Sequence, residues 1–158
     1  GDRTMTSIIK VDQIQNAAGT VTNIIAKSAF LAEYSGGRRN HTGEYVVFDR
    51  VNHNTGNNYN SSTGVYTCPY SGLYWFGSSA RGDNNAGVRS HIGIHVNDSA
   101  YPYSDSRLGD QLTPSSSGID SAYGAYVLSL NAGNTVRIYH YGSQYDPGIT
   151  YFTGYFIG

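Results

Sequence analysis

Residues 122–141 have the sequence AYGAYVLSLNAGNTVRIYHY, in which two alternating runs flank the segment NAGN. Asn and Gly in such a cluster are typical of a tight turn. In the second run, Val136 and Ile138 alternate with Arg137 and Tyr139, which is the period-two pattern of a half-buried strand. The stretch therefore predicts two antiparallel strands joined by a short turn.

The rest of the chain continues this pattern of short runs separated by Gly, Pro, Asn and Asp. Six further runs are predicted as strands: 28–34, 44–51, 65–68, 73–80, 91–96 and 149–157. Clusters at 52–58 and 81–85 are expected to be turns, and we interpret Arg81-Gly82-Asp83 as turn chemistry rather than as an adhesion motif. Eight or more strands at this spacing predict an all-β, antiparallel sandwich or jelly roll.

The composition argues against several classes of protein. The chain has 158 residues, which fits one domain, and only 13% of them are charged, with two Lys and two Glu. Strong helix formers are too scarce for a helical bundle. A net charge of −1 argues against nucleic acid as a partner. No apolar run approaches the ~20 residues of a membrane span, so no membrane insertion is expected.

Two of the predicted strands are apolar or aromatic on both sides. In the last strand, Phe152 and Phe156 lie on one face, and Tyr151, Tyr155 and Ile157 lie on the other. The strand that contains Tyr123 shows the same pattern. Because an antiparallel sheet of a monomer usually has a polar face toward water, these strands predict that a neighbouring subunit covers one sheet.

Further segments resemble one known family. They are the runs FDRVN at 48–52, GNNY at 56–59, TGVYTCP at 63–69, GLYWF at 72–76, VLSLNAGNTV at 127–136 and FTGYFI at 152–157. In this order and spacing, the region from about Ser28 to Gly158 resembles the globular head of complement component 1q. The resemblance implies a ten-stranded jelly roll of the complement 1q/tumour-necrosis-factor type that forms a homotrimer. Six residues are then predicted at the trimer interface, of which Tyr139 and Tyr141 fit a binding surface equally well: Tyr123, Tyr139, Tyr141, Tyr151, Tyr155 and Ile157.

Residues 1–27 differ from the remainder and are predicted to be an N-terminal arm, followed by a globular domain at 28–158. Residues 1–4 are expected to be an artificial extension before a natural start at Met5. The run MTSIIKVDQIQN at 5–16 is similar to the start of tail- and head-fibre proteins of marine bacteriophages. This resemblance implies that the arm joins other virion proteins, through Ile8, Ile9, Val11 and Ile14.

Catalysis is not expected. His91 and His95 share a strand face, but four residues of strand span ~13 Å, which is too far for one metal ion. There is no nucleophile elbow and no obvious pair of carboxylates. The single cysteine, Cys68, lies in an apolar run and is predicted to be a buried hydrophobic side chain rather than a reactive thiol.

No cofactor is expected, and the metal site stays unassigned. Aspartates in loop-like stretches suit calcium, but no twelve-residue calcium loop is present, and solvated carboxylates are the preferred interpretation. The aspartates concerned are Asp98, Asp105, Asp110, Asp120 and Asp146. Three glycosylation sequons start at Asn40, Asn60 and Asn97 and are expected by chance in a chain of this composition.

The excess of tyrosine, 15 residues, indicates a recognition surface. Tyrosine binds by stacking and through one hydroxyl, which suits sugars and protein surfaces. The long polar stretch 97–117 and a later loop supply the predicted ligand-binding residues Tyr101, Tyr103, Asp105 and Tyr145. The sequence thus favours a non-enzymatic trimeric virion protein, a fibre knob or a head or tail decoration, that attaches to a host glycan or protein. The alternative is a secreted, extracellular complement 1q-domain lectin of an invertebrate, and an adhesive structural protein is a third hypothesis.

Overall fold

The computed structural model describes the side chains of residues 28–37, 43–80, 92–100, 123–141 and 150–158. It also describes the strand backbone at 13–15, 21–23, 39–40, 81–83, 89–91, 107–112, 119–122 and 144–145. Across these residues the chain forms strands and turns, with no helix. Accordingly, the described residues contain no helix that is long and apolar enough to cross a membrane.

The strands have the following bounds: β1 Gln13–Gln15, β2 Val21–Asn23, β3 Ala29–Glu33, β4 Arg39–Asn40, β5 Glu44–Tyr45, β6 Arg50–Thr55, β7 Tyr59–Asn60, β8 Val65–Thr67, β9 Gly72–Asp83, β10 Arg89–Val96, β11 Ser99–Ala100, β12 Arg107–Leu112, β13 Ile119–Leu130, β14 Thr135–His140, β15 Gln144–Tyr145 and β16 Tyr151–Phe156.

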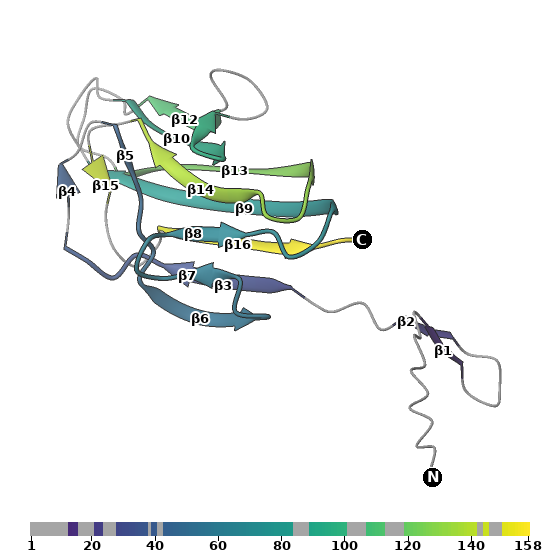
Figure 1. Ribbon diagram of the computed structural model, residues 1–158. Helices are drawn as coiled ribbons and strands as arrows, with labels where there is room; N and C mark the ends of the chain where they lie inside the picture. Colours follow the sequence, from purple (N-terminus) through teal and green to yellow (C-terminus); the bar gives the residue numbers. More distant parts are fainter. Residues whose placement is uncertain are drawn as a thin grey trace, which may run out of the picture.

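Two antiparallel sheets form the body of the molecule (Figure 1). One sheet has five strands in the order β13-β9-β16-β3-β6. The other follows the path β11-β10-β14-β8-β7, with β12 paired to β10 and β5 paired to β14. Two smaller pairings, β1 with β2 and β4 with β15, stand outside these sheets. Strands that are distant in sequence are thus neighbours, as in a jelly roll.

The core lies between the two sheets and is rich in aromatic rings. Phe30 and Phe76 of the five-stranded sheet contact Tyr66 of the other sheet, with ring centroids 4.9 Å and 5.5 Å apart. Phe152 packs edge-on against Phe30 at 4.8 Å. All four side chains have no exposed surface. Face-to-face packing of this kind confirms the predicted all-β sandwich.

The two strands predicted from residues 122–141 are confirmed as β13 and β14. Leu128, Leu130, Val136 and Ile138 are buried, while the residues between them are more exposed. Gly133 takes a φ of +85° in the turn between the strands, where a side chain would be strained.

The predicted strand 44–51 was wrong. β5 ends at Tyr45 and β6 begins at Arg50, and these two strands belong to different sheets. Val46 and Phe48 are fully buried between them, because the chain crosses the core there. The apolar residues between β5 and β6 therefore form a crossover between the two sheets rather than part of one strand. β6 itself covers most of a segment that was predicted as a turn.

The predicted turn at 81–85 was also wrong at its start, because Arg81, Gly82 and Asp83 belong to β9. They pair with Ser121, Asp120 and Ile119 of β13 in one continuous register. A long partner strand supplies the backbone hydrogen bonds, so polar residues and glycine extend the strand despite their turn preference.

The stretch 97–117, predicted as one long loop, includes β11 and β12, and Tyr145 lies in β15 rather than in a loop. Ten strands were implied by the family resemblance. The described part of the chain instead divides into sixteen strand segments, several only two residues long. The antiparallel all-β architecture agrees with the prediction, and the strand count differs.

Candidate functional site

The outer surface of the five-stranded sheet carries a patch that we call the apolar face. Six of its large side chains are exposed, on β13, on β9, on β16 and at the residue after β16: Leu73 (44%), Tyr123 (70%), Val127 (57%), Tyr151 (36%), Tyr155 (46%) and Ile157 (47%). The strand register sets several of them in rows across the sheet. One row is Val127–Trp75–Tyr155, and another is Tyr123–Ser79–Tyr151. A contiguous exposed patch of this kind marks an interaction surface.

Trp75 and Tyr155 form the centre of the apolar face. Their rings stack with centroids 5.5 Å apart. A Cβ atom at Gly77 would lie only 2.5 Å from the Trp75 ring, so the indole covers the position where a side chain would stand. The pair thus presents a flat aromatic surface, which is suited to packing against another protein.

Four of the predicted interface residues lie on the apolar face: Tyr123, Tyr151, Tyr155 and Ile157. Sequence reasoning missed Leu73, Trp75 and Val127 as interface candidates. Leu73 and Trp75 alternate with the buried Tyr74 and Phe76, so this strand is apolar on both sides. The two-sided pattern that identified the last strand would therefore have identified Leu73 and Trp75 as well. Tyr139 and Tyr141 instead come from β14 and the residue after it, in the other sheet.

A second group of aromatic residues surrounds His95 on the seven-stranded sheet, and we call it the tyrosine–histidine cluster: Tyr45, His95, Tyr139 and Tyr141. The Nδ1 atom of His95 lies 3.0 Å from the Tyr45 hydroxyl, and its Nε2 atom lies 2.8 Å from the Tyr141 hydroxyl. The Tyr139 ring stacks on the imidazole at 4.8 Å, with only 5° between the planes. His95 is 8% exposed, so the cluster encloses it.

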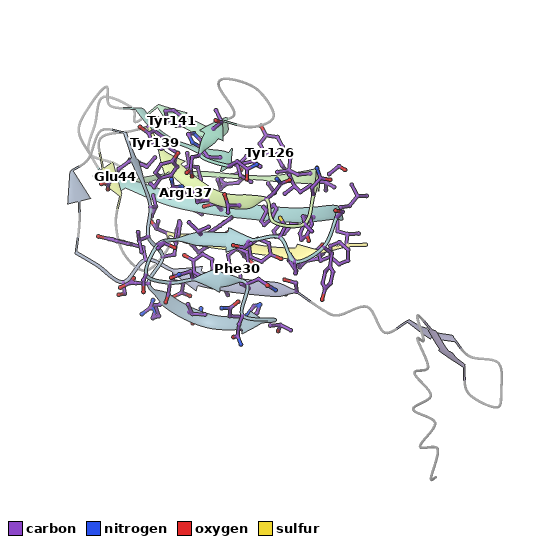
Figure 2. All side chains as sticks on the ribbon, in the orientation of Figure 1. Phe30, Glu44, Tyr126, Arg137, Tyr139 and Tyr141 are labelled. Atoms are coloured by element: carbon purple, nitrogen blue, oxygen red, sulfur yellow. The ribbon has the colours of Figure 1, made fainter. Side chains whose placement is uncertain are left out.

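Arg137 and Asp98 border this cluster. The Arg137 guanidinium carbon lies 3.3 Å from the centroid of the Tyr45 ring, a cation–π contact. Arg137 also forms an ion pair with Asp98 at 2.6 Å, and the Tyr45 hydroxyl donates to the Asp98 carbonyl at 3.1 Å. Figure 2 shows Arg137, Tyr139 and Tyr141 gathered near β5, with Tyr126 and Phe30 elsewhere in the sandwich.

The electrostatics of the cluster keep His95 neutral. Burial lowers the pKa of His95 below its ordinary value, and the Arg137 charge lowers it further, while Asp98 opposes this change. The hydroxyl groups of Tyr45 and Tyr141 form hydrogen bonds with the imidazole, so the cluster has the character of a structural network of half-buried tyrosines around a buried histidine.

The structure describes only part of the aspartates that were weighed as calcium ligands, for which solvated carboxylates were the preferred interpretation. Asp98 is paired with Arg137, and Asp110 and Asp120 lie within β12 and β13 rather than in loops. Asp105 and Asp146 are outside the described residues. Among the residues whose side chains are described, no three His, Cys, Asp or Glu could hold one metal ion together. Cys68 is buried as predicted, and burial raises the pKa of its thiol to about 12.

Most of the predicted ligand-binding and anchoring residues are not described. Tyr101, Tyr103 and Asp105 lie outside the described residues, as do Ile8, Ile9 and Val11. Of the remaining two, only the strand backbone is described: Tyr145 pairs with Arg39, and Ile14 pairs with Thr22.

A small open cavity of about 320 Å³ lies beside the end of β3, lined by Tyr34, Gly36, Gly37, Val47 and Asp49. The Asp49 carboxylate accepts hydrogen bonds from the Ser35 backbone N–H (2.9 Å) and hydroxyl (2.7 Å), which lower its pKa. The sequence did not predict this cavity.

Comparison with known proteins supports the fold. Residues 29–157 match the C1q domain family. The globular domain of zebrafish complement 1qA superposes with a TM-score of 0.63 at 21% identity, covering 84% of this chain and 98% of that one. Murine APRIL at pH 5.0 gives 0.63 at 12% identity, covering 83% and 99%. The Eiger TNF of S. frugiperda gives 0.59 at 13% identity, covering 84% and 92%.

Proposed function

The chain belongs to the C1q domain family, and on that premise we propose that it is a non-enzymatic, homotrimeric attachment module on a bacteriophage particle. The observation that carries the proposal is the apolar face. Six large apolar side chains between 36% and 70% exposed are costly to leave in water, because apolar surface gains free energy on burial. We propose that two further copies of this chain cover the apolar face.

A threefold assembly fits the distribution of apolar and charged residues on this surface. The apolar side chains occupy β13, β9 and β16, while the β3 and β6 side of the same sheet carries the Glu33–Arg50 ion pair. In a cyclic trimer, each interface joins two different patches of the same surface, so an apolar centre with a polar border suits it.

The trimer would present the same set of tyrosine-containing recognition residues at three equivalent places. We propose Tyr101, Tyr103, Asp105 and Tyr145 as ligand-binding residues for a host-surface glycan or protein. Three copies on one particle raise the effective concentration at each site, so weak single contacts give firm attachment. The half-buried Tyr139 and Tyr141 come from the other sheet and not from the apolar face, and we therefore assign them to recognition rather than to the interface.

The arm would anchor the module to the virion. We propose that Ile8, Ile9, Val11 and Ile14 bury their side chains in the preceding fibre or capsid protein. Strand β1 pairs with β2 and with neither of the two sheets, which supports a segment that serves a separate partner.

A secreted lectin is the second candidate function, because C1q domain proteins are typically extracellular. Asn60 and Asn97, two of the three sequon asparagines, are exposed. Mass spectrometry of native material separates the two candidates. A glycan on Asn40, Asn60 or Asn97 supports the secreted protein, and phage structural genes beside this gene support the virion protein.

Attachment is tested with the double variant Tyr101→Ala/Tyr103→Ala. We expect binding to host cells and to a glycan array to fall at least about tenfold, because each lost tyrosine contact contributes on the order of 1 kcal/mol or more. The matched control is Thr67→Ala/Asn131→Ala, which alters two exposed side chains and should bind normally. Light scattering must show the same mass for all variants. Unchanged binding of the tyrosine variant would contradict the assignment of these residues.

A further inference from the structure

We propose that the small cavity beside the end of β3 binds one monosaccharide unit of a glycan, held by the Asp49 carboxylate. Its volume of about 320 Å³ is at the lower end of the usual ~300–1,000 Å³ for small-molecule sites, so it suits one sugar ring rather than a longer chain. This subsite would serve the glycan attachment proposed above, on which it depends for its purpose but not for its geometry. It is formed by residues other than Tyr101, Tyr103, Asp105 and Tyr145.

The Asp49 carboxylate is held in one orientation beside the cavity. Its Oδ2 atom accepts a hydrogen bond from the Ser35 hydroxyl at 2.7 Å, and its Oδ1 atom accepts one from the Ser35 backbone N–H at 2.9 Å. These two bonds lower the pKa of Asp49, so the group is ionised at neutral pH. The residue is exposed, and an ionised carboxylate has about four acceptor positions. A ligand that enters the cavity can therefore donate further hydrogen bonds to it.

The charged residues next to Asp49 leave this carboxylate available. Arg50, which follows it in the chain, forms an ion pair with Glu33 at the end of β3, and the Arg50 Nε–H donates to the same carboxylate at 2.9 Å. The Asn52 amide donates to the other oxygen of Glu33 at 2.8 Å. The positive charge of Arg50 is thus directed toward Glu33, so a ligand at Asp49 does not have to displace Arg50.

The walls of the cavity are apolar side chains and bare backbone. Tyr34 and Val47 contribute the side chains, and Gly36 and Gly37 contribute backbone. The Tyr34 hydroxyl donates to the Gly37 carbonyl at 2.9 Å, which holds this segment against the ring. A Cβ atom at Gly36 would lie 2.6 Å from Cζ of Tyr34, whereas no atom lies within 4 Å of the Cβ position at Gly37. The close approach therefore requires a glycine at 36, and the lack of a side chain at 37 leaves space beside the cavity.

A neutral sugar ring has both features for which this cavity offers partners. Two adjacent hydroxyl groups of a pyranose can donate to the oxygens of one carboxylate, and hydrogen bonds to an ionised acceptor are roughly twice as strong as neutral ones. The C–H groups of the ring can pack against the apolar surface of Tyr34 and Val47. Because the Asp49 charge repels anions, we expect a neutral hexose or N-acetylhexosamine rather than an acidic sugar.

The cavity lies at the end of β3 that is farther from residues 1–27. β3 begins at Ala29 and ends at Glu33, and Tyr34 of the cavity follows directly. Five residues of strand span about 16 Å. If the N-terminal arm joins the chain to the particle, the cavity therefore lies at the end of β3 away from that junction, where a host glycan is accessible.

Titration of the isotope-labelled full chain, followed by nuclear magnetic resonance, tests the subsite. The probes are the methyl glycosides of glucose, galactose, mannose and N-acetylglucosamine, with glycerol and methylammonium chloride for comparison. At least one glycoside should shift the amide signals of residues 35–37 and 47–49, and saturate with a dissociation constant on the order of 1 mM. The amides of β9 should not shift. The proposal would be overturned by the absence of a saturating shift with any glycoside, by equal shifts with glycerol, or by a response to methylammonium alone.

Variants show whether the Asp49 charge holds the sugar. Asp49→Asn retains the shape of the side chain and should weaken glycoside binding at least about tenfold, because charge-assisted hydrogen bonds are lost. The matched control is Asp98→Asn, at an exposed aspartate after β10 of the other sheet, and it should bind with an unchanged dissociation constant. Gly37→Leu adds a side chain in the space beside the cavity and should also weaken binding. If Asp49→Asn fails to fold, Gly37→Leu decides, and unchanged binding by the deciding variant contradicts the subsite.

The subsite and the attachment through Tyr101 and Tyr103 can fail separately. Tyr101→Ala/Tyr103→Ala should leave the glycoside shifts of residues 35–37 and 47–49 unchanged, because neither tyrosine lines the cavity. Weaker host-cell binding by this double variant, without any glycoside shift in the unmodified protein, would refute the subsite alone. Saturating glycoside shifts that Asp49→Asn weakens would support the subsite, even if the double variant binds host cells normally.

Discussion

Gly154 shows how closely single residues are fitted in the core of this domain. A Cβ atom at this position would lie 2.3 Å from Cδ1 of Phe76 and 3.1 Å from Cε1 of Phe30. Both rings are fully buried and belong to the stack that joins the two sheets. The absence of a side chain at Gly154 is therefore what allows these rings to reach the inner surface of β16.

We accordingly predict that Gly154→Ala destabilises the domain by about 1–3 kcal/mol, the usual cost of overpacking a rigid core. Urea denaturation followed by circular dichroism measures this change. The control is Gly37→Ala, because no atom lies within 4 Å of the Cβ position there. That control should alter the free energy of unfolding by at most about 1 kcal/mol, in the stabilising direction. Equal stability of the two variants would contradict the packing argument.

For single residues, the sequence predicted burial well wherever consecutive residues alternate between the two faces of a strand. Phe152 and Tyr151 were assigned to opposite faces, and they are 0% and 36% exposed. The environment of His95 was not predictable in this way. Its hydrogen-bonding partners, Tyr45 and Tyr141, are 50 and 46 residues distant along the chain, so only the sheet register brings them together.

At the scale of elements, the N-terminal arm is the part whose pairing is separate. Strands β1 and β2 pair over three register positions and join neither sheet. A two-stranded hairpin of this length has little stability alone, because it buries too little apolar surface. We therefore expect that the hairpin is stabilised by contact with a partner outside the globular domain.

Deletion of residues 1–27 should therefore leave residues 28–158 folded, with a melting temperature within about 2 °C of that of the full chain, because β1 and β2 pair with neither sheet. The same deletion should abolish incorporation into particles. Circular dichroism measures the first outcome, and immunoblotting of purified particles measures the second. Exchanging Ile14 alone for Asp, with the rest of the arm retained, should reduce incorporation in the same direction. Normal incorporation of the truncated knob would refute the anchoring role.

The sequence predicted strands correctly where one apolar run stays within one sheet. It failed where a single run crosses from one sheet to the other. The run 44–51 has an uninterrupted apolar stretch from Tyr45 to Phe48, and only the structure shows that the chain leaves one sheet at Tyr45 and enters the other at Arg50. β6 was missed for the opposite reason. Its sequence, RVNHNT, has no apolar alternation, and it forms a strand because β3 provides a hydrogen-bonding edge.

For the whole molecule, the question is what covers the apolar face. The two-sided apolar pattern of β16 predicted a covered sheet, and the fold of a single chain leaves that face in contact with water. An aspartate placed at its centre would be buried without a partner after assembly, at a cost of several kcal/mol per interface. Since a cyclic trimer repeats the same interface three times, one substitution acts on all of them.

We predict that light scattering of the unmodified protein gives three times the 17.1 kDa mass of one chain, and that Val127→Asp gives a monomer. Val127 is an exposed β-branched residue of β13 on the apolar face. Thr67→Asp is the matched control, because Thr67 is an exposed β-branched residue of similar size in β8, on the other sheet. Both variants gain the same charge, so only the position differs, and the control should remain a trimer. A monomeric unmodified protein, or a trimeric Val127→Asp variant, would show that the apolar face serves a different partner.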